Sequence, residues 1–202
     1  IVKEKNKIIF LNFQSLFKLL PQDDHIFLDI QQKVPNCQFW FFESKSKFVT
    51  SIFKTRLLKL SKEYGISFNK YFYFLPRCKY NEFLGFIEES DIILDSLSFS
   101  GFNTAVEAVS LNKPIVTLPG LLMKKKLAYS VLKKINLKDT IATSKEEYVE
   151  IAIKLAKDDN FRNYIISKII KNKSKLFCDE KPIKFIEEFF KNTNTMVHNK
   201  RV

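Results

Sequence analysis

The stretch DIILDSLSFSGFNTAVEAVSLNKPIVTLPG, residues 91–120, decides the fold of this chain. It begins with an apolar run at 91–95, continues through a turn that contains Gly101, and then has apolar residues at helical spacing over 103–111. A second apolar run follows at 114–118. A strand, a helix and a second strand in this order predict a βαβ unit with two parallel strands.

The same alternation of strands and helices extends along the rest of the chain. We expect further strands at 7–12, 37–42 and 71–75, a short one at 140–142, and helices at 23–33, 48–63, 81–89, 124–135 and 145–157. The strands are continuous apolar runs, which is typical of strands that crossover helices bury on both faces. The sequence therefore predicts an α/β fold with a Rossmann-like parallel sheet flanked by helices.

The length of the chain predicts a single domain. With 202 residues, of which 46% are hydrophobic, the chain can bury one core but not two of ordinary size. Helical patterns at 160–175 and 182–191 predict two helices that close a domain spanning 1–191, and residues 192–202 are expected to form a loose tail. The chain opens with Ile1 rather than methionine, so we expect a part of a longer gene product.

The formal net charge of +12 raises the question of a polyanionic partner, because Lys and Arg neutralise phosphates. The sequence has no arginine-rich run and no recognised nucleic-acid module, so we expect no nucleic-acid partner. A basic surface that binds nucleic acid or anionic lipid stays open as an alternative. It predicts association that weakens steeply with salt.

The cysteines and the hydropathy pattern indicate the compartment. Cys37, Cys78 and Cys178 are odd in number and widely spaced, so they suggest neither a disulfide framework nor a zinc motif. No apolar run approaches the roughly 20 residues that span a bilayer, and no signal-peptide pattern opens the sequence. We therefore expect a cytoplasmic protein without a membrane span.

The turn around Gly101 is the best candidate for a ligand site. In open α/β sheets, ligands collect beyond the carboxyl ends of the strands, and free N–H groups at helix N-termini bind anions. Gly101 lets the backbone approach a ligand, Asn103 and Thr104 can present donors to a diphosphate, and Glu107, one turn further, can accept hydrogen bonds from ribose hydroxyls. On spacing alone, Asn103 or Thr104 could equally cap the helix while Glu107 faces solvent.

Two other loops are expected at the same edge of the sheet. Segment 12–18 follows the first strand and ends at Lys18, which could reach a diphosphate, although a solvated lysine is the alternative. Segment 118–120 follows the fifth strand and leads to the basic run 124–126, for which a solvated helix start is the alternative. His25 and His198 stand in no metal or catalytic-triad spacing, so no metal site is expected.

The chain resembles the C-terminal region of family 41 glycosyltransferases, the family of protein O-GlcNAc transferases and the bacterial glycosyltransferases related to them. The resemblance covers about residues 8–190, in order and with few gaps. It is carried by segments 12–18, 34–36, 90–95, 101–104, 113–120, 129–132, 146–148, 155–158 and 176–179.

The resemblance implies a GT-B architecture, in which two Rossmann-like domains face each other across a cleft and the C-terminal one binds the UDP-sugar without a metal. Lys18 would contact the diphosphate and support the departing UDP, Asn103 and Thr104 would bind phosphate, and Glu107 would bind the ribose. Glu107 stands where the family usually has aspartate. Lys126 falls at the position of an expected basic residue, but as lysine rather than arginine it lacks the planar fork.

The resemblance also implies how the base would be bound, with departures from the family pattern. Tyr80, Phe83 and Phe86 stand where the family has uracil-contacting Lys, His and Arg. Tyr80 could still stack on a uracil and the backbone around Cys78 could read its edge, while Phe83 and Phe86 are expected to pack in the core. Ser15, in the segment that ends at Lys18, completes the expected nucleotide contacts together with Gly101.

The leading hypothesis is therefore the donor-binding half of a glycosyltransferase that transfers GlcNAc or a hexose from a UDP-sugar to protein side chains. The acceptor-side half, or a TPR region, would be missing from this chain, which alone should be inactive. The alternative is a degenerate GT-B domain that keeps the fold for protein interaction without catalysis.

Overall fold

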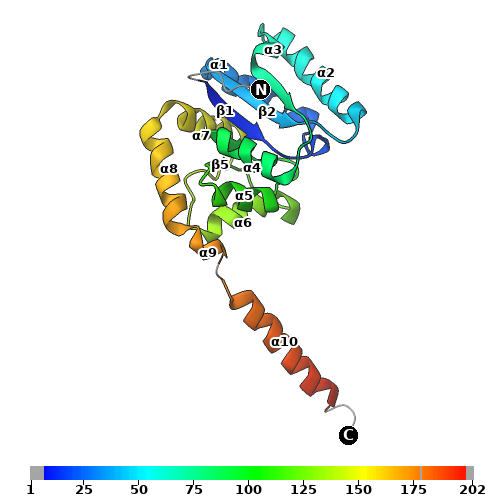
Figure 1. Cartoon of the computed structure of the whole chain (residues 1–202), viewed down its shortest axis with the longest axis vertical. Coiled ribbons are helices and arrows are strands. Elements are labelled where there is room, and N and C mark those ends of the chain that lie inside the picture. Colours follow the sequence, from blue (N-terminus) through cyan, green and yellow to red (C-terminus); the bar gives the residue numbers. More distant parts are fainter. Residues whose placement is uncertain (1–6, 178, 199–202) are drawn as a thin grey trace.

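The computed structural model describes residues 7–177 and 179–198. The strands are β1 (Ile8–Asn12), β2 (Cys37–Phe42), β3 (Phe72–Leu75), β4 (Ile92–Leu94) and β5 (Ile115–Val116). They form a 5-stranded parallel sheet in the order β3-β2-β1-β4-β5 (Figure 1). Helices connect successive strands, so the expected α/β fold is confirmed. The expected strand at 140–142 is reduced to a single parallel bridge between Thr117 and Ile141, because the pairing does not extend beyond it.

The helices between and after the strands mostly agree with the sequence pattern, but the helix expected at 124–135 is divided into a 3-10 turn and a shorter helix, and the short helix at 68–71 was not expected. They are α1 (His25–Lys33), α2 (Lys47–Glu63), α3 (Phe68–Tyr71), α4 (Tyr80–Glu89), α5 (Asn103–Ser110), α6 (Leu127–Lys134) and α7 (Lys145–Lys157), with short 3-10 turns η1 (Leu16–Lys18), η2 (Pro21–Asp23) and η3 (Met123–Lys125). The start of α7 follows from its sequence, because the Ser144 side chain accepts a hydrogen bond from the backbone N–H of Glu147.

The two faces of the sheet bury alternate side chains of β2. On one face, Phe39 and Phe41 contact Phe27 of α1, with ring centroids 5.7 and 5.1 Å away. On the other face, Trp40 and Phe42 contact Phe86 of α4 at 6.2 and 5.7 Å. Helices therefore cover both faces, which is why the strands are apolar throughout.

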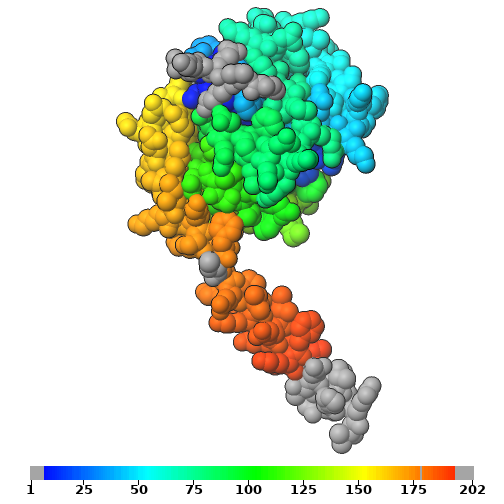
Figure 2. Space-filling model, in the orientation of Figure 1, coloured from blue at the N-terminus to red at the C-terminus, as the bar shows by residue number. Residues whose placement is uncertain are grey.

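The C-terminal part of the chain departs from expectation. Two helices, α8 (Asp159–Asn172) and α9 (Ser174–Phe177), occupy the segment expected as one helix, and α8 packs against α7. The last helix, α10 (Lys181–His198), projects away from the body of the domain (Figures 1 and 2). Its described apolar side chains are exposed, so α10 does not close the domain as expected: Ile183, Phe185, Ile186, Phe189 and Phe190.

Residues 192–198 belong to this helix and are not a loose tail. The prediction of a tail is wrong there because no glycine or proline follows Pro182 to interrupt the helix that begins at Lys181. The remainder of the expected tail, 199–202, lies outside the described residues.

Candidate functional site

The loops after β1, β4 and β5 meet at one edge of the sheet, because these neighbouring strands are parallel and end side by side. The buried carboxylate of Asp95, directly after β4, organises the middle loop. It accepts hydrogen bonds from Ser100 Oγ at 2.6 Å, Gly101 N at 3.0 Å and Thr117 Oγ1 at 2.8 Å. Burial raises the pKa of Asp95, and these hydrogen bonds oppose the shift. Asp95 thereby holds the turn that leads into α5.

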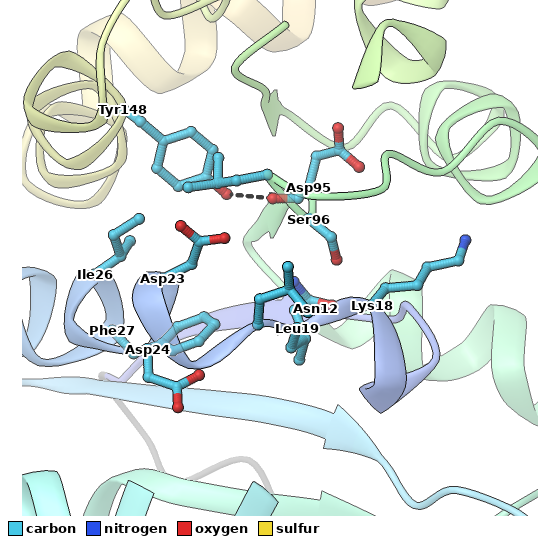
Figure 3. Close-up of a pocket in the computed structure, with 12 residues that line it drawn as sticks. Asn12, Lys18, Leu19, Asp23, Asp24, Ile26, Phe27, Asp95, Ser96 and Tyr148 are labelled. Carbon is cyan, nitrogen blue, oxygen red and sulfur yellow. Dashed lines mark hydrogen bonds between the residues drawn. The ribbon is translucent and has the colours of Figure 1, made fainter. Parts of the chain in front are cut away.

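Further hydrogen bonds attach this loop to α6 and α7. Ser100 Oγ accepts from the backbone N–H of Ala128 at 2.8 Å, and Ser100 N donates to the carbonyl of Lys124 at 2.9 Å. The hydroxyl of Tyr148 donates to the backbone carbonyl of Asp95 at 2.8 Å (Figure 3). The Asp95–Gly101 turn is therefore anchored on several sides, which preorganises it for a ligand.

Gln14 connects the loop after β1 to the start of α5. Lys18 Nζ donates to Gln14 Oε1 at 2.9 Å, and Gln14 Nε2 donates to Thr104 Oγ1 at 2.6 Å. The Gln14 side chain crosses directly over Gly101, where an added Cβ would lie 1.9 Å from Gln14 Nε2. A side chain at 101 would therefore displace the Gln14 amide, so glycine permits the close approach of the two loops. The structure brings Lys18 and Thr104 into one cluster, as expected, through a glutamine that sequence reasoning did not single out.

The Lys18 amine is partly shielded from solvent. Its Nζ lies 4.3 Å from the centroid of the Phe99 ring, which belongs to the loop after β4. Burial lowers the pKa of Lys18, and the negative charge of Asp95 opposes that shift. Lys18 is therefore held within the site by the loops around it, which argues against a freely solvated side chain.

The N-terminus of α5 has no side-chain cap. Its N-cap residue is Phe102, which makes no capping hydrogen bond, and neither Asn103 nor Thr104 caps the helix. Asn103 is exposed and Thr104 half-buried. The alternative in which these residues merely cap the helix is thus wrong. Backbone N–H groups at a helix N-terminus attract anions, so this end of α5, beside Lys18, suits a diphosphate.

Glu107 is half-buried one turn further along α5 and interacts with Tyr80 at the start of α4. The two groups lie close enough to interact electrostatically. Burial raises the pKa of Glu107, the Tyr80 hydroxyl opposes this shift, and the charge of Glu107 raises the pKa of Tyr80. The structure therefore places these two expected nucleotide contacts together.

A groove of about 580 Å³ opens beside the cluster and contains the other expected contacts of the nucleotide. Ser15, Cys78 and Tyr80 line it, together with Gln14 and Phe83. Phe83 and Phe86 pack against the core as expected, and Phe83 also forms part of the groove wall.

A second cavity, shown in Figure 3, lies between Asn12, Ser96 and Tyr148. Its volume of about 20 Å³ is too small for a sugar or a nucleotide. The groove is therefore the feature of suitable size next to the cluster.

Lys126 lies at the junction of η3 and α6, and its side chain is exposed. Lys124 and Ala128 on either side of it hydrogen-bond to Ser100, so this segment adjoins the Asp95–Gly101 turn. Within the described part of the chain, no group of three or more His, Cys, Asp or Glu side chains could hold a metal ion. No helix there is long and apolar enough to cross a membrane.

Comparison with known proteins decides the family. The model of glycosyl transferase family 41 matches residues 3–183. The chain belongs to glycosyl transferase family 41. Among individual proteins, one relative is the probable UDP-N-acetylglucosamine–peptide N-acetylglucosaminyltransferase SPINDLY of Arabidopsis thaliana, which is 26% identical over 152 residues. The alignment covers 75% of this chain but only 16% of SPINDLY, so this chain corresponds to a small part of that protein.

Solved structures share the fold. A mutant O-GlcNAc transferase of Thermobaculum terrenum matches with a TM-score of 0.80 at 20% identity, over 95% of this chain and 36% of the other. The Anabaena protein HepE, solved with UDP and glucose, matches with a TM-score of 0.65 at 16% identity, over 91% and 49%. The chain thus has the fold of a GT-B glycosyltransferase domain, as the family resemblance implied.

Proposed function

We propose that this chain is the donor-binding domain of a glycosyltransferase that moves GlcNAc or a hexose from a UDP-sugar to protein side chains. Membership of family 41 and the names of the relatives support the reaction class. The observation that carries the proposal for this domain is the cluster at the N-terminus of α5, where Lys18, Thr104 and uncapped N–H groups converge beside Glu107.

The proposed mechanism uses the cluster to bind the diphosphate and support its departure. The oxygen of an acceptor hydroxyl attacks the anomeric carbon of the sugar and gives up its proton to a base on the acceptor side. The bond from that carbon to the β-phosphate oxygen breaks, and UDP leaves with the electron pair. Lys18 and the N–H groups of α5 stabilise the negative charge that grows on the leaving diphosphate, so no metal is required in this proposal. The Glu107 carboxylate accepts hydrogen bonds from the ribose hydroxyls.

The acceptor side of the reaction is proposed to lie outside this chain. The chain covers 36% of the solved O-GlcNAc transferase chain that it matches, which leaves room for acceptor contacts in the part that it does not cover. We therefore infer that this domain binds donor but does not transfer sugar alone. We also propose a cytoplasmic location, supported by the odd and widely spaced cysteines.

Calorimetric titration with UDP tests the donor site. We expect binding that Lys18→Ala and Glu107→Ala weaken by about tenfold each, because each removes a contact that involves a charged group. Lys157→Ala and Glu150→Ala are matched controls, since both side chains are exposed on α7, and they should leave the affinity unchanged. Equal affinity in all four variants, or no binding of UDP at millimolar concentration, would refute the proposal.

A further inference from the structure

We propose that the small cavity shown in Figure 3 binds one ordered water molecule, which joins the side chains of Asn12, Ser96 and Tyr148. The cavity lies where β1 and β4 end, and Lys18 also lines it. The inference does not rest on the proposed function, because these three polar groups are buried whichever ligand the neighbouring cluster binds.

The Ser96 hydroxyl is a buried polar group that needs a partner. Ser96 is 3% exposed, and its Oγ has no hydrogen-bond partner among the described residues. Figure 3 shows this hydroxyl directed toward Asn12. A hydroxyl that is buried without a partner destabilises a protein, so such groups are usually bonded to other protein atoms or to buried water.

The Asn12 amide offers a donor to the same space. Its Oδ1 accepts a hydrogen bond from the backbone N–H of Gln14 at 3.1 Å, which fixes the orientation of the amide and directs Nδ2 away from Gln14. Asn12 is 2% exposed and lines the cavity, and within the described part of the chain its Nδ2 donates to no protein acceptor. Two buried polar groups, at the ends of neighbouring strands, therefore line one cavity.

Tyr148 supplies a third partner for a water molecule. Its hydroxyl donates to the backbone carbonyl of Asp95 at 2.8 Å, so the phenolic oxygen can still accept a hydrogen bond. A water in the cavity can accept from Asn12 Nδ2, donate to Tyr148 Oη and bond to Ser96 Oγ, whose hydrogen can rotate. Buried waters typically make about three hydrogen bonds of this kind.

The size and the charges of the cavity favour water over a cation. Its volume of about 20 Å³ suits one water molecule, which needs roughly 10–15 Å³. The positive charge of Lys18 at its wall disfavours a cation. The carboxylates at the wall are already engaged by other side chains: Asp23 by Lys145, Asp24 by Arg56, and Asp95 by Ser100 and Thr117.

A crystal structure of the chain without UDP tests the proposal directly. We expect one ordered water within hydrogen-bond distance, roughly 2.7–3.2 Å, of Asn12 Nδ2, Ser96 Oγ and Tyr148 Oη. A cavity without an ordered water, at a resolution that shows waters elsewhere in the core, would overturn the proposal. A cation at the same position, recognised by its contacts with carboxylate oxygens, would overturn it as well.

Thermal unfolding of Ser96→Ala gives an independent test. If Ser96 is bonded to the water, the variant loses a hydrogen bond and its Tm should fall by about 2–4 °C. If Ser96 has no partner, the variant only removes an unpaired hydroxyl, so an unchanged or higher Tm would overturn the proposal.

Thr140→Val is the matched control for that measurement. Thr140 is 0% exposed and its Oγ1 also has no partner among the described residues, but Thr140 does not line the cavity. Its replacement by the isosteric valine should leave the Tm unchanged or raise it. Equal losses in Thr140→Val and Ser96→Ala would show that the loss at Ser96 does not come from a water in the cavity. Neither assay uses UDP, so failure here leaves the proposed donor site intact.

Discussion

Replacement of Gln14 by leucine tests how the cluster is held together. Gln14 is only 4% exposed, and its amide accepts a hydrogen bond from Lys18 at 2.9 Å and donates one to Thr104 at 2.6 Å. Leucine is of similar size but makes neither bond. A hydrogen bond to a charged group contributes about 1.5–3 kcal/mol, of which we expect about 1–2 kcal/mol to appear as lost UDP affinity, or roughly 5- to 30-fold.

Calorimetry of the single and double variants identifies the cause of that loss. If Gln14 acts by positioning Lys18, then Gln14→Leu combined with Lys18→Ala should bind UDP about as weakly as Lys18→Ala alone. The matched control is Gln31→Leu, because Gln31 is 5% exposed in α1, away from the cluster, and should leave UDP affinity unchanged. Additive losses in the double variant, or unchanged affinity in Gln14→Leu, would refute the reasoning.

Three further predictions concern the surrounding residues. Asp95→Ala should lower the free energy of unfolding by about 3 kcal/mol or more in urea denaturation, because the Gly101 N–H and the hydroxyls of Ser100 and Thr117 lose their acceptor. An unchanged free energy of unfolding would show that the turn does not depend on Asp95. UDP affinity should fall as the pH decreases through the pKa of Glu107, which lies above the ordinary 4.5, because the protonated carboxyl is a poorer hydrogen-bond acceptor. Calorimetry across pH should show that Glu107→Gln lacks this fall in affinity. Identical pH profiles in the two proteins would contradict the prediction. Arg56→Ala should lower the free energy of unfolding by about 3–5 kcal/mol in the same denaturation assay, because it leaves the buried Asp24 carboxylate without its ion-pair partner at 2.7 Å. Adding Asp24→Asn removes the unpaired charge and should recover part of this loss. If the double variant is no more stable than Arg56→Ala alone, the unpaired charge is not the cause.

The sheet and most helices follow from the sequence because their signals are local. Strands such as Cys37–Phe42 are continuous apolar runs, and the helical spacing after Gly101 gives α5 within one residue at its end. The strand at 140–142 was overestimated because apolar character cannot tell a single bridge from a ladder. For α10, the helical pattern was correct over 182–191, but no local signal shows whether another surface covers a helix.

The cluster itself was only partly predictable. Family resemblance selects Lys18 and Thr104 by position, and the structure brings them together. Their connection through Gln14 could not be predicted, because a glutamine in a loop has no periodicity and its partner Thr104 is 90 residues away.

The most direct test of the donor site is a titration of the isotopically labelled chain with UDP, followed by the chemical shifts of its backbone amides. The account predicts the largest saturable changes at Gly101, Thr104 and Glu107 and in the loop that ends at Lys18, with smaller changes around Tyr80. Shifts confined to other parts of the fold, such as α7 and α8, or no saturable shifts at millimolar UDP, would contradict the assignment of this domain to donor binding.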